Sequence, residues 1–200
     1  MSQHEDIAVL RIELEEIEPL IWRRVAVPAA MNLKSLHDVI QAAMGWFNYH
    51  LWEFEVGDRA YGVPDPDGID WGKRTYKAQS LRLSRLVESG VRAFGYAYDF
   101  GDDWHHRVVV EAVETAEPDV HYPWFLGGER RCPPEDVGGV PGYYDFLDAI
   151  AKPRSRQGRS LLDWYGGPYD PDDIDEEQIP ITLKRIASRW RPGRAGGAAH

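Results

Sequence analysis

Side chains capable of acid–base or metal chemistry gather in one short stretch, YDFGDDWHH, at residues 98–106. Carboxylates and imidazoles serve as general acids and bases, and they also bind divalent metal ions. Asp102 or Asp103 could pair with His106 in this way. Alternatively, Gly101 and the aspartates could form a tight turn between two strands, with the carboxylates accepting backbone N–H groups. The turn is the favoured interpretation, and its polar groups are expected to line whatever pocket exists.

Strand periodicity separates the two adjacent histidines. Apolar and polar residues alternate along 105–114, and successive side chains of a strand point to opposite faces. His106 is therefore expected to face inward and His105 outward, so the two cannot readily chelate one ion. Other polar residues also fall on faces expected to be buried or beside them, and a shared pocket is one interpretation. The candidate pocket residues are Arg23, His37, His50, Asp99, Asp102, Trp104, His106, Glu135 and Asp136.

Arg23 falls on the apolar face of the predicted strand 21–27. A buried guanidinium needs an acid or a carbonyl group as partner. Asp99 lies opposite the aromatic face of its own strand and could reach across the sheet. We therefore predict an ion pair between Arg23 and Asp99 or Asp102.

Apolar and polar residues alternate along several segments, as they do in half-buried strands. The segment 118–142 has no such pattern and is expected to be irregular. Strands are predicted at 7–15, 21–27, 50–56, 93–99 and 105–114.

Helical signals are strongest at 33–44, where Asn32 is a good N-cap and Gly45 a good stop. Ser84 is expected to cap a short helical turn. The acidic run at 175–177 is expected in the first turn of the last helix, where the helix dipole favours negative charge. The C-terminal helices are predicted at about 143–151, 160–165 and 175–189.

This order of elements predicts an α+β fold: a single domain with an antiparallel sheet, one helix after the first hairpin and a helical C-terminal third. The chain has 200 residues, of which 43% are hydrophobic, so it can bury one core without disulfides. We expect residues 1–190 to form the domain and residues 191–200 to be a disordered tail.

The charge and the cysteine content limit the kinds of partner and the cellular compartment that we expect. The formal net charge of −10 disfavours nucleic acid as a generic partner, because a polyanion needs clustered Lys and Arg. The arginines at 154–159 and 189–194 lack interleaved aromatic residues and are expected to be solvated. Cys132 is the single cysteine, which excludes an intramolecular disulfide and fits a reducing cytoplasm. No apolar run approaches the roughly 20 residues of a membrane span, so a cytoplasmic protein is expected.

Three further motifs are weak. Asp99-Phe100-Gly101 copies a kinase tripeptide, but the other kinase motifs are missing. The aspartates at 65–70 do not have calcium-loop spacing, so a plain loop is expected. The PPEDVGG segment at 133–139 is expected to be scaffolding: the prolines extend the backbone, Glu135 and Asp136 accept amides or cap the next helix, and the glycines allow positive φ.

The sequence as a whole resembles the Ri-plasmid ORF-three-like family over about 7–186. Three segments carry the resemblance: IWRRVAVPAAMNLKSLHDVIQAAMGWFNYHLWEF, YDFGDDWHHRV and YPWFLGGERRCPPEDVGGVPGYYDFL. It implies a compact α+β domain, and members are sometimes labelled as passengers of insertion elements or as resolvases. The resolvase label does not fit, because the early serine, Ser2, stands at the chain end and no basic cradle precedes a tyrosine. Relatives often carry further cysteines where Trp124 and Val137 stand here, which puts a thiolate metal site in doubt.

These observations favour a binding or interaction module for an unspecified protein or small molecule, and the resemblance implies an association with mobile genetic elements. A hydrolase or metal-dependent enzyme using the inward histidines and nearby acids is the first alternative. A DNA-binding accessory protein is the second. No cofactor is predicted, and a divalent metal ion is the less favoured alternative. Whether the protein is an enzyme stays open.

Overall fold

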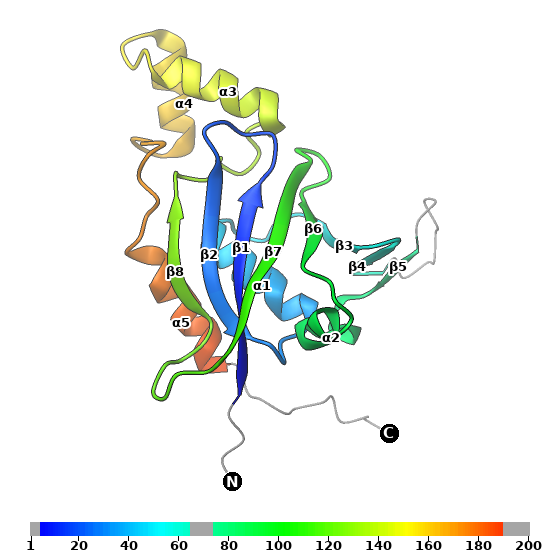
Figure 1. Cartoon of the computed structure of the whole chain (residues 1–200). Coiled ribbons are helices and arrows are strands. Elements are labelled where there is room, and N and C mark those ends of the chain that lie inside the picture. The colour runs from blue at the N-terminus through cyan, green and yellow to red at the C-terminus, as the bar shows by residue number, and fades with distance from the viewer. Residues whose placement is uncertain (1–4, 65–73, 190–200) are drawn as a thin grey trace.

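An eight-stranded, mostly antiparallel sheet is the framework of the computed structural model, which describes residues 5–64 and 74–189 (Figure 1). The strand order is β5-β4-β3-β6-β7-β1-β2-β8, and among the described strands only the edge pair β4–β5 is parallel. The α+β class is thereby confirmed. The strands are β1 Asp6–Leu14, β2 Ile21–Pro28, β3 Trp52–Val56, β4 Arg59–Gly62, β5 Thr75–Lys77, β6 Ala93–Tyr98, β7 Trp104–Thr115 and β8 Trp124–Glu129.

The inner face of the sheet follows the predicted alternation. Leu10, Ile12 and Leu14 of β1 are fully buried, whereas Arg11 and Glu13 between them form an ion pair at 2.7 Å on the other face. The expected strands at 7–15, 21–27, 93–99 and 105–114 all form within one or two residues of these bounds. Burial of the apolar face supplies the main driving force for this layer.

Helices cover one face and one end of the sheet. Asn32 caps α1 by accepting the N–H of Ser35 at 2.9 Å, and Gly45 ends it with a left-handed φ of 82°, as predicted. α1 packs on the sheet, α5 lies beside α1 and β8, and α3 and α4 pair at the end of the sheet (Figure 1). The helices are α1 Leu33–Met44, α2 Leu83–Glu88, α3 Gly139–Ile150, α4 Arg156–Tyr165 and α5 Gln178–Arg189.

The prediction that 118–142 is irregular is wrong for β8. This edge strand contains Gly127 and Gly128, which interrupt the alternation that identifies strands. A side chain at Gly128 would place its Cβ 2.7 Å from the carbonyl oxygen of Trp22 on β2, so glycine allows the two strands to approach. The short strands β4 and β5 were also not predicted.

Several predicted helix starts differ from the structure, and α3 and α4 begin at 139 and 156 rather than at about 143 and 160. α2 follows Arg82 rather than being capped by Ser84, and Arg82 makes no side-chain capping bond. α5 begins at Gln178, so the acidic run at 175–177 precedes its first turn. Asp175 has a left-handed φ of 62°, a conformation that interrupts the helix.

Two expectations fall outside the described residues: the loop at 65–70 and the tail at 191–200. None of the described helices has the length and apolar character needed to cross a membrane.

Candidate functional site

A closed ring of hydrogen bonds fixes the loop between α1 and β3. His37 Nδ1 lies 2.8 Å from the Tyr96 hydroxyl, and the oxygen of that hydroxyl accepts from Gln41 Nε2 at 3.0 Å. His37 Nε2 lies 2.7 Å from Asn48 Oδ1, and the Asn48 N–H donates to Gln41 Oε1 at 3.0 Å. Both ring nitrogens of His37 are therefore used, and burial lowers its pKa to about 3. His37 is a neutral residue that positions the loop at Asn48. Holding Asn48 in place also holds His50, which follows it by two residues in the chain.

The turn between β6 and β7 presents one carboxylate oxygen. Asp99 has a left-handed φ of 57°, and its Oδ1 accepts the N–H groups of Gly101 at 2.9 Å and Asp102 at 3.3 Å. Its Oδ2 lies 3.5 Å from Nε2 of His50. The favoured turn interpretation of the stretch 98–106 is thus correct, and the turn also brings the Asp99 carboxylate close to His50.

The PPEDVGG segment brings a second and a third carboxylate to the same place. Glu135 Oε1 accepts the N–H of Phe47 at 2.7 Å and the hydroxyl of Tyr98 at 3.0 Å. The predicted role of Glu135 as an amide acceptor is confirmed. The alternative role as a helix cap is wrong, because α3 starts after Gly138 with no side-chain cap. Asp136 has a left-handed φ of 56°.

These segments converge on the imidazole of His50. Its Nε2 atom lies 3.1 Å from Asp136 Oδ1, 3.5 Å from Asp99 Oδ2 and 3.8 Å from Glu135 Oε2. The same atom is buried and has no partner in hydrogen-bond geometry among the described residues. Donor atoms of His50, Asp99 and Asp136 all lie within 4.8 Å of one another. Such a group of one imidazole and several carboxylates has the composition of a divalent metal site.

The site is closed on one side and open on the other. The Asp99 and Glu135 side chains are 8% and 11% exposed, and the Asp136 side chain is 66% exposed. Burial raises the pKa of Glu135, while the N–H of Phe47 and the hydroxyl of Tyr98 oppose that rise by stabilising the carboxylate. Burial also raises the pKa of Tyr98, followed in effect by the charge of Glu135, so its phenol keeps its proton and donates.

Exposed apolar side chains flank the site. Phe47, Tyr49 and Leu51 are 66%, 74% and 63% exposed, and Phe100 is 52% exposed. The rings of Phe47 and Tyr49 stack with centroids 5.6 Å apart. His50 lies between Tyr49 and Leu51 in the chain, so exposed apolar residues precede and follow it.

Arg23 does not join this cluster, and the predicted ion pair with Asp99 or Asp102 is wrong. The guanidinium instead donates to the carbonyl oxygens of Trp22, Ala43 and Glu129 at 2.8–3.0 Å, and to the Cys132 sulfur at 3.4 Å. Strand alternation correctly placed Arg23 in the interior but could not identify its partners.

Other candidate residues have structural positions. His106 is buried as expected, and His105 is exposed on the opposite face. The His106 Nδ1 lies 3.2 Å from the carbonyl oxygen of Tyr96, and burial lowers its pKa to about 3. Trp104 packs against Trp46, with ring centroids 6.1 Å apart. Asp102 Oδ2 accepts the N–H of Gly138 at 3.0 Å, so Asp102 joins two segments of the site without facing His50.

Sequence reasoning missed the residues that hold the site in place, namely Gln41, Asn48, Tyr96 and Tyr98. Tyr96 and Tyr98 lie on the aromatic face of the predicted strand 93–99, which from the sequence is expected only to pack. Their hydroxyl groups in fact position His37 and Glu135. Two adjacent tyrosines on a buried face could have signalled buried polar partners, because buried hydroxyls are normally hydrogen-bonded.

Comparison with known proteins gives a consistent relationship. Residues 6–178 match the family described as "Plasmid pRiA4b ORF-3-like protein". The sequence is 38% identical over 183 residues to "Uncharacterized protein y4hQ" of Sinorhizobium fredii (strain NBRC 101917 / NGR234), covering 90% of this chain and 92% of that one. The fold is similar, with a TM-score of 0.78 and 30% identity, to the crystal structure of "Protein of Unknown Function MM3350" from Methanosarcina mazei Go1, covering 90% of this chain and 97% of that one.

Proposed function

The chain belongs to the plasmid pRiA4b ORF-3-like family, and we propose that its function is to bind a divalent transition-metal ion at His50, Asp99 and Asp136. Glu135 is close enough to act as a fourth ligand after a small movement. The proposal selects the metal-dependent alternative for the polar pocket, with His50 rather than His37 or His106 as the imidazole ligand.

The observation that carries the proposal is the environment of the His50 Nε2 atom. A buried polar atom normally has a hydrogen-bond partner, and this one has none among the described residues. Three carboxylates surround it at 3.1–3.8 Å. Two donors that each lie about 2.1 Å from one ion are themselves about 3–4 Å apart. Slight closure of this cluster would therefore satisfy both the imidazole and the carboxylates.

The donor set narrows the kind of ion. Calcium prefers oxygen ligands alone, whereas an imidazole with carboxylates suits Mn²⁺, Fe²⁺ or Zn²⁺. The exposed carboxylate of Asp136 leaves one side of the centre open to solvent. An ion held by three or four protein ligands with an open side keeps a position for water, whose pKa it lowers. A hydrolytic activity is the reaction class that such a centre supports.

If the same residues form an ion-pair network without a metal ion, the expected results are the opposite. A protonated His50 could pair with the carboxylates directly, and the cluster would then be a structural ion-pair network. In that case a metal ion would not stabilise the protein, and replacing His50 would destabilise it even without metal.

Thermal unfolding with and without metal distinguishes these states. The protein is first treated with EDTA and dialysed, and then titrated with Mn²⁺, Co²⁺ or Zn²⁺. At a concentration about 100 times Kd, binding to the folded state adds about 2.7 kcal/mol, which raises Tm by about 5–10 °C for a chain of this size. Calorimetric titration should give one site per chain.

The matched variants are His50→Ala, Asp136→Asn and His105→Ala. His105 is also a histidine beside an aspartate, with Nε2 3.0 Å from Asp103 Oδ1, but it lies outside the cluster. We expect His105→Ala to keep the full metal-induced rise in Tm, and His50→Ala and Asp136→Asn to lose most of it. An equal rise in His50→Ala would show that the ion binds elsewhere, and no rise in the unsubstituted protein would rule out the centre.

A further inference from the structure

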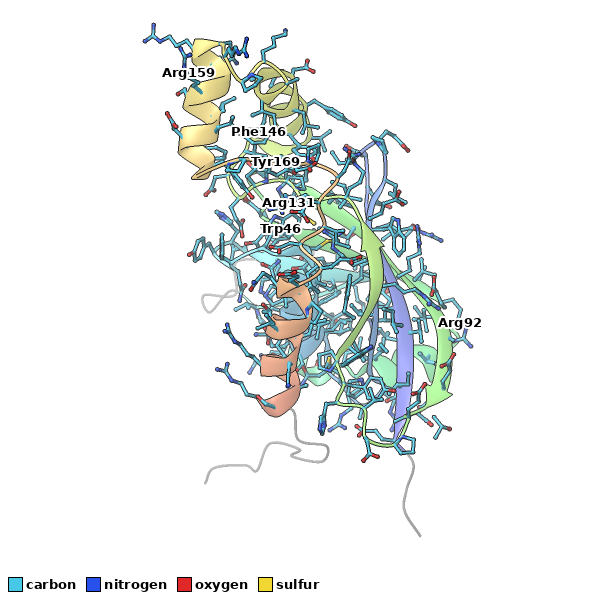
Figure 2. The ribbon with its side chains drawn as sticks, turned by 90° about the vertical axis from the view of Figure 1, so that its left-hand side faces the viewer. Trp46, Arg92, Arg131, Phe146, Arg159 and Tyr169 are labelled. Atoms are coloured by element: carbon cyan, nitrogen blue, oxygen red, sulfur yellow. The ribbon has the colours of Figure 1, made fainter. Side chains whose placement is uncertain are left out.

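A cavity of about 710 Å³ lies beside the proposed metal centre. It is bounded by the end of α1, the segment 131–135, the end of α4 and the first turns of α5. In Figure 2, the labelled residues Trp46 and Arg131 lie between the α3–α4 pair and α5. Cavities that hold small organic ligands typically have about this volume.

The wall of this cavity contains a buried positive charge. Arg23 borders the cavity, is 1% exposed, and forms no ion pair with any acid among residues 5–64 and 74–189. Four of its hydrogen bonds go to three carbonyl oxygens and one sulfur. A guanidinium has five N–H donors and keeps its charge at any ordinary pH, so one donor and the whole net charge lack a partner within the described part of the chain.

The neighbouring thiol does not supply the missing negative charge. The Cys132 sulfur lies 3.4 Å from Nη2 of Arg23 and 3.2 Å from the sulfur of Met44. Burial raises the pKa of this thiol more strongly than the nearby Arg23 and Arg131 lower it. The thiol is therefore a neutral acceptor, and Arg23 keeps an uncompensated charge.

The other charged residues around the cavity already have partners or lie at its rim. Arg131 donates to the Asp173 carboxylate at 2.6 Å and to the Tyr165 hydroxyl at 3.2 Å. Glu135 is held by the Phe47 N–H and Tyr98. Asp175 and Arg185 are exposed. Arg23 is thus the buried charge that a ligand could neutralise.

The remaining wall is largely apolar. Met44, Trp46 and Ile179 are buried there, and Ile174 is half-buried. A ligand that fills the cavity would bury an apolar body against these side chains, which favours binding in proportion to the area removed from water.

We propose that this cavity binds a small organic monoanion, with an aromatic or branched apolar body and a carboxylate or sulfonate group that pairs with Arg23. A neutral hydrophobic ligand would leave the buried charge uncompensated. A polyanion would meet the carboxylates of Glu135 and Asp175 at the border. Phe47 and Glu135 border both this cavity and the proposed metal centre, but the proposed anion site does not rest on metal binding.

Two probes with the same ring system test the charge requirement. 8-Anilinonaphthalene-1-sulfonate carries one sulfonate, and N-phenyl-1-naphthylamine has the same aromatic rings without it. Both fluoresce when they leave water. A charge-assisted hydrogen bond is worth enough that the sulfonate should bind about tenfold tighter or more, at one site per folded chain.

Two tryptophan substitutions on α5 locate the probe. Thr182 lines the cavity, so Thr182→Trp should fill it and abolish sulfonate binding. Ile181 is the next residue, is 46% exposed and does not border the cavity, so Ile181→Trp should leave binding unchanged. Circular dichroism and Tm confirm that both variants fold.

Arg23→Met provides a second measurement. If this variant folds, it should bind the two probes equally. Equal affinity of the two probes for the unsubstituted protein would overturn the proposal, and so would sulfonate binding that survives Thr182→Trp. If Arg23→Met does not fold, the comparison of the two probes and the comparison of Thr182→Trp with Ile181→Trp still test the proposal.

Discussion

Asp102 accepts a hydrogen bond from the backbone N–H of Gly138 at 3.0 Å, and this bond joins the β6–β7 turn to the PPEDVGG segment. Asp99 lies on the first of these segments and Asp136 on the second. Their carboxylates face the same imidazole because the two segments are held side by side. Asp102 therefore positions two proposed ligands without being one.

Replacing Asp102 separates positioning from ligation. Asp102→Ala removes the acceptor of the Gly138 N–H, and we expect a loss of about 0.5–1.5 kcal/mol in the free energy of unfolding. Metal affinity should fall as well, because Asp99 and Asp136 are less well held. Asp102→Asn retains an acceptor oxygen and should restore most of both properties. Urea unfolding and calorimetric metal titration measure the two effects, and an unchanged metal affinity in Asp102→Ala would contradict the positioning role.

The adjacent glycines of the PPEDVGG segment should differ in their tolerance of alanine. Gly138 and Gly139 have φ values of 95° and 66°, which L-residues seldom adopt. A Cβ at Gly138 would have ordinary space, with its nearest neighbour at 3.6 Å. A Cβ at Gly139 would lie 2.5 Å from the carbonyl oxygen of Asp102. We expect Gly138→Ala to cost about 1 kcal/mol and Gly139→Ala to cost about 2–3 kcal/mol in chemical unfolding. Equal losses would show that the backbone at Asp102 can move aside.

The two buried histidines predict a stability that falls in acid. Burial lowers the pKa of His37 and of His106 to about 3, against 6.5 for an ordinary histidine. Below pH 6.5 the unfolded chain binds protons that the folded chain does not bind. The stability that these two histidines contribute is therefore fully present above pH 6.5. It is lost as the pH falls toward 3, by about 1.4 kcal/mol per pH unit for each histidine.

His106→Gln tests this pH dependence. Glutamine keeps an N–H donor for the carbonyl oxygen of Tyr96 but does not titrate. The free energy of unfolding is measured in urea between pH 6 and pH 4.5. Its slope against pH should be smaller in this variant by about 1.4 kcal/mol per pH unit. A slope equal to that of the unsubstituted protein would show that His106 does not stay neutral in the folded state.

Local sequence patterns predicted the elements that carry the site more successfully than the site itself. The alternation along β1 and β7 and the caps of α1 are set by neighbouring residues, so sequence alone identified them. The same alternation correctly assigned opposite faces to His105 and His106. Strands with glycine-rich stretches, such as β8, lack this signal.

The convergence of His50, Asp99 and Asp136 could not be predicted in this way. It depends on how β3 pairs with β6, on the left-handed backbone at Asp99 and Asp136, and on contacts between segments far apart in the chain. Strand periodicity states which face a side chain occupies, but not which groups lie opposite it. For that reason the sequence named His50 and the carboxylates as candidates without their mutual contacts, and paired Arg23 with the wrong partners.

Arg23 and Asp99 should behave as independent residues in a double-mutant cycle. Arg23→Met removes the donor to the carbonyl oxygens of Trp22, Ala43 and Glu129, and buried unsatisfied carbonyls should cost about 2–5 kcal/mol in total. Asp99→Asn affects the β6–β7 turn, and the two residues share no hydrogen-bond partner among those described. Their effects on urea unfolding, measured with EDTA present, should therefore add within about 0.5 kcal/mol. A coupling energy above about 1 kcal/mol would restore the ion pair that the sequence suggested, and would remove the uncompensated charge on which the proposed anion site depends.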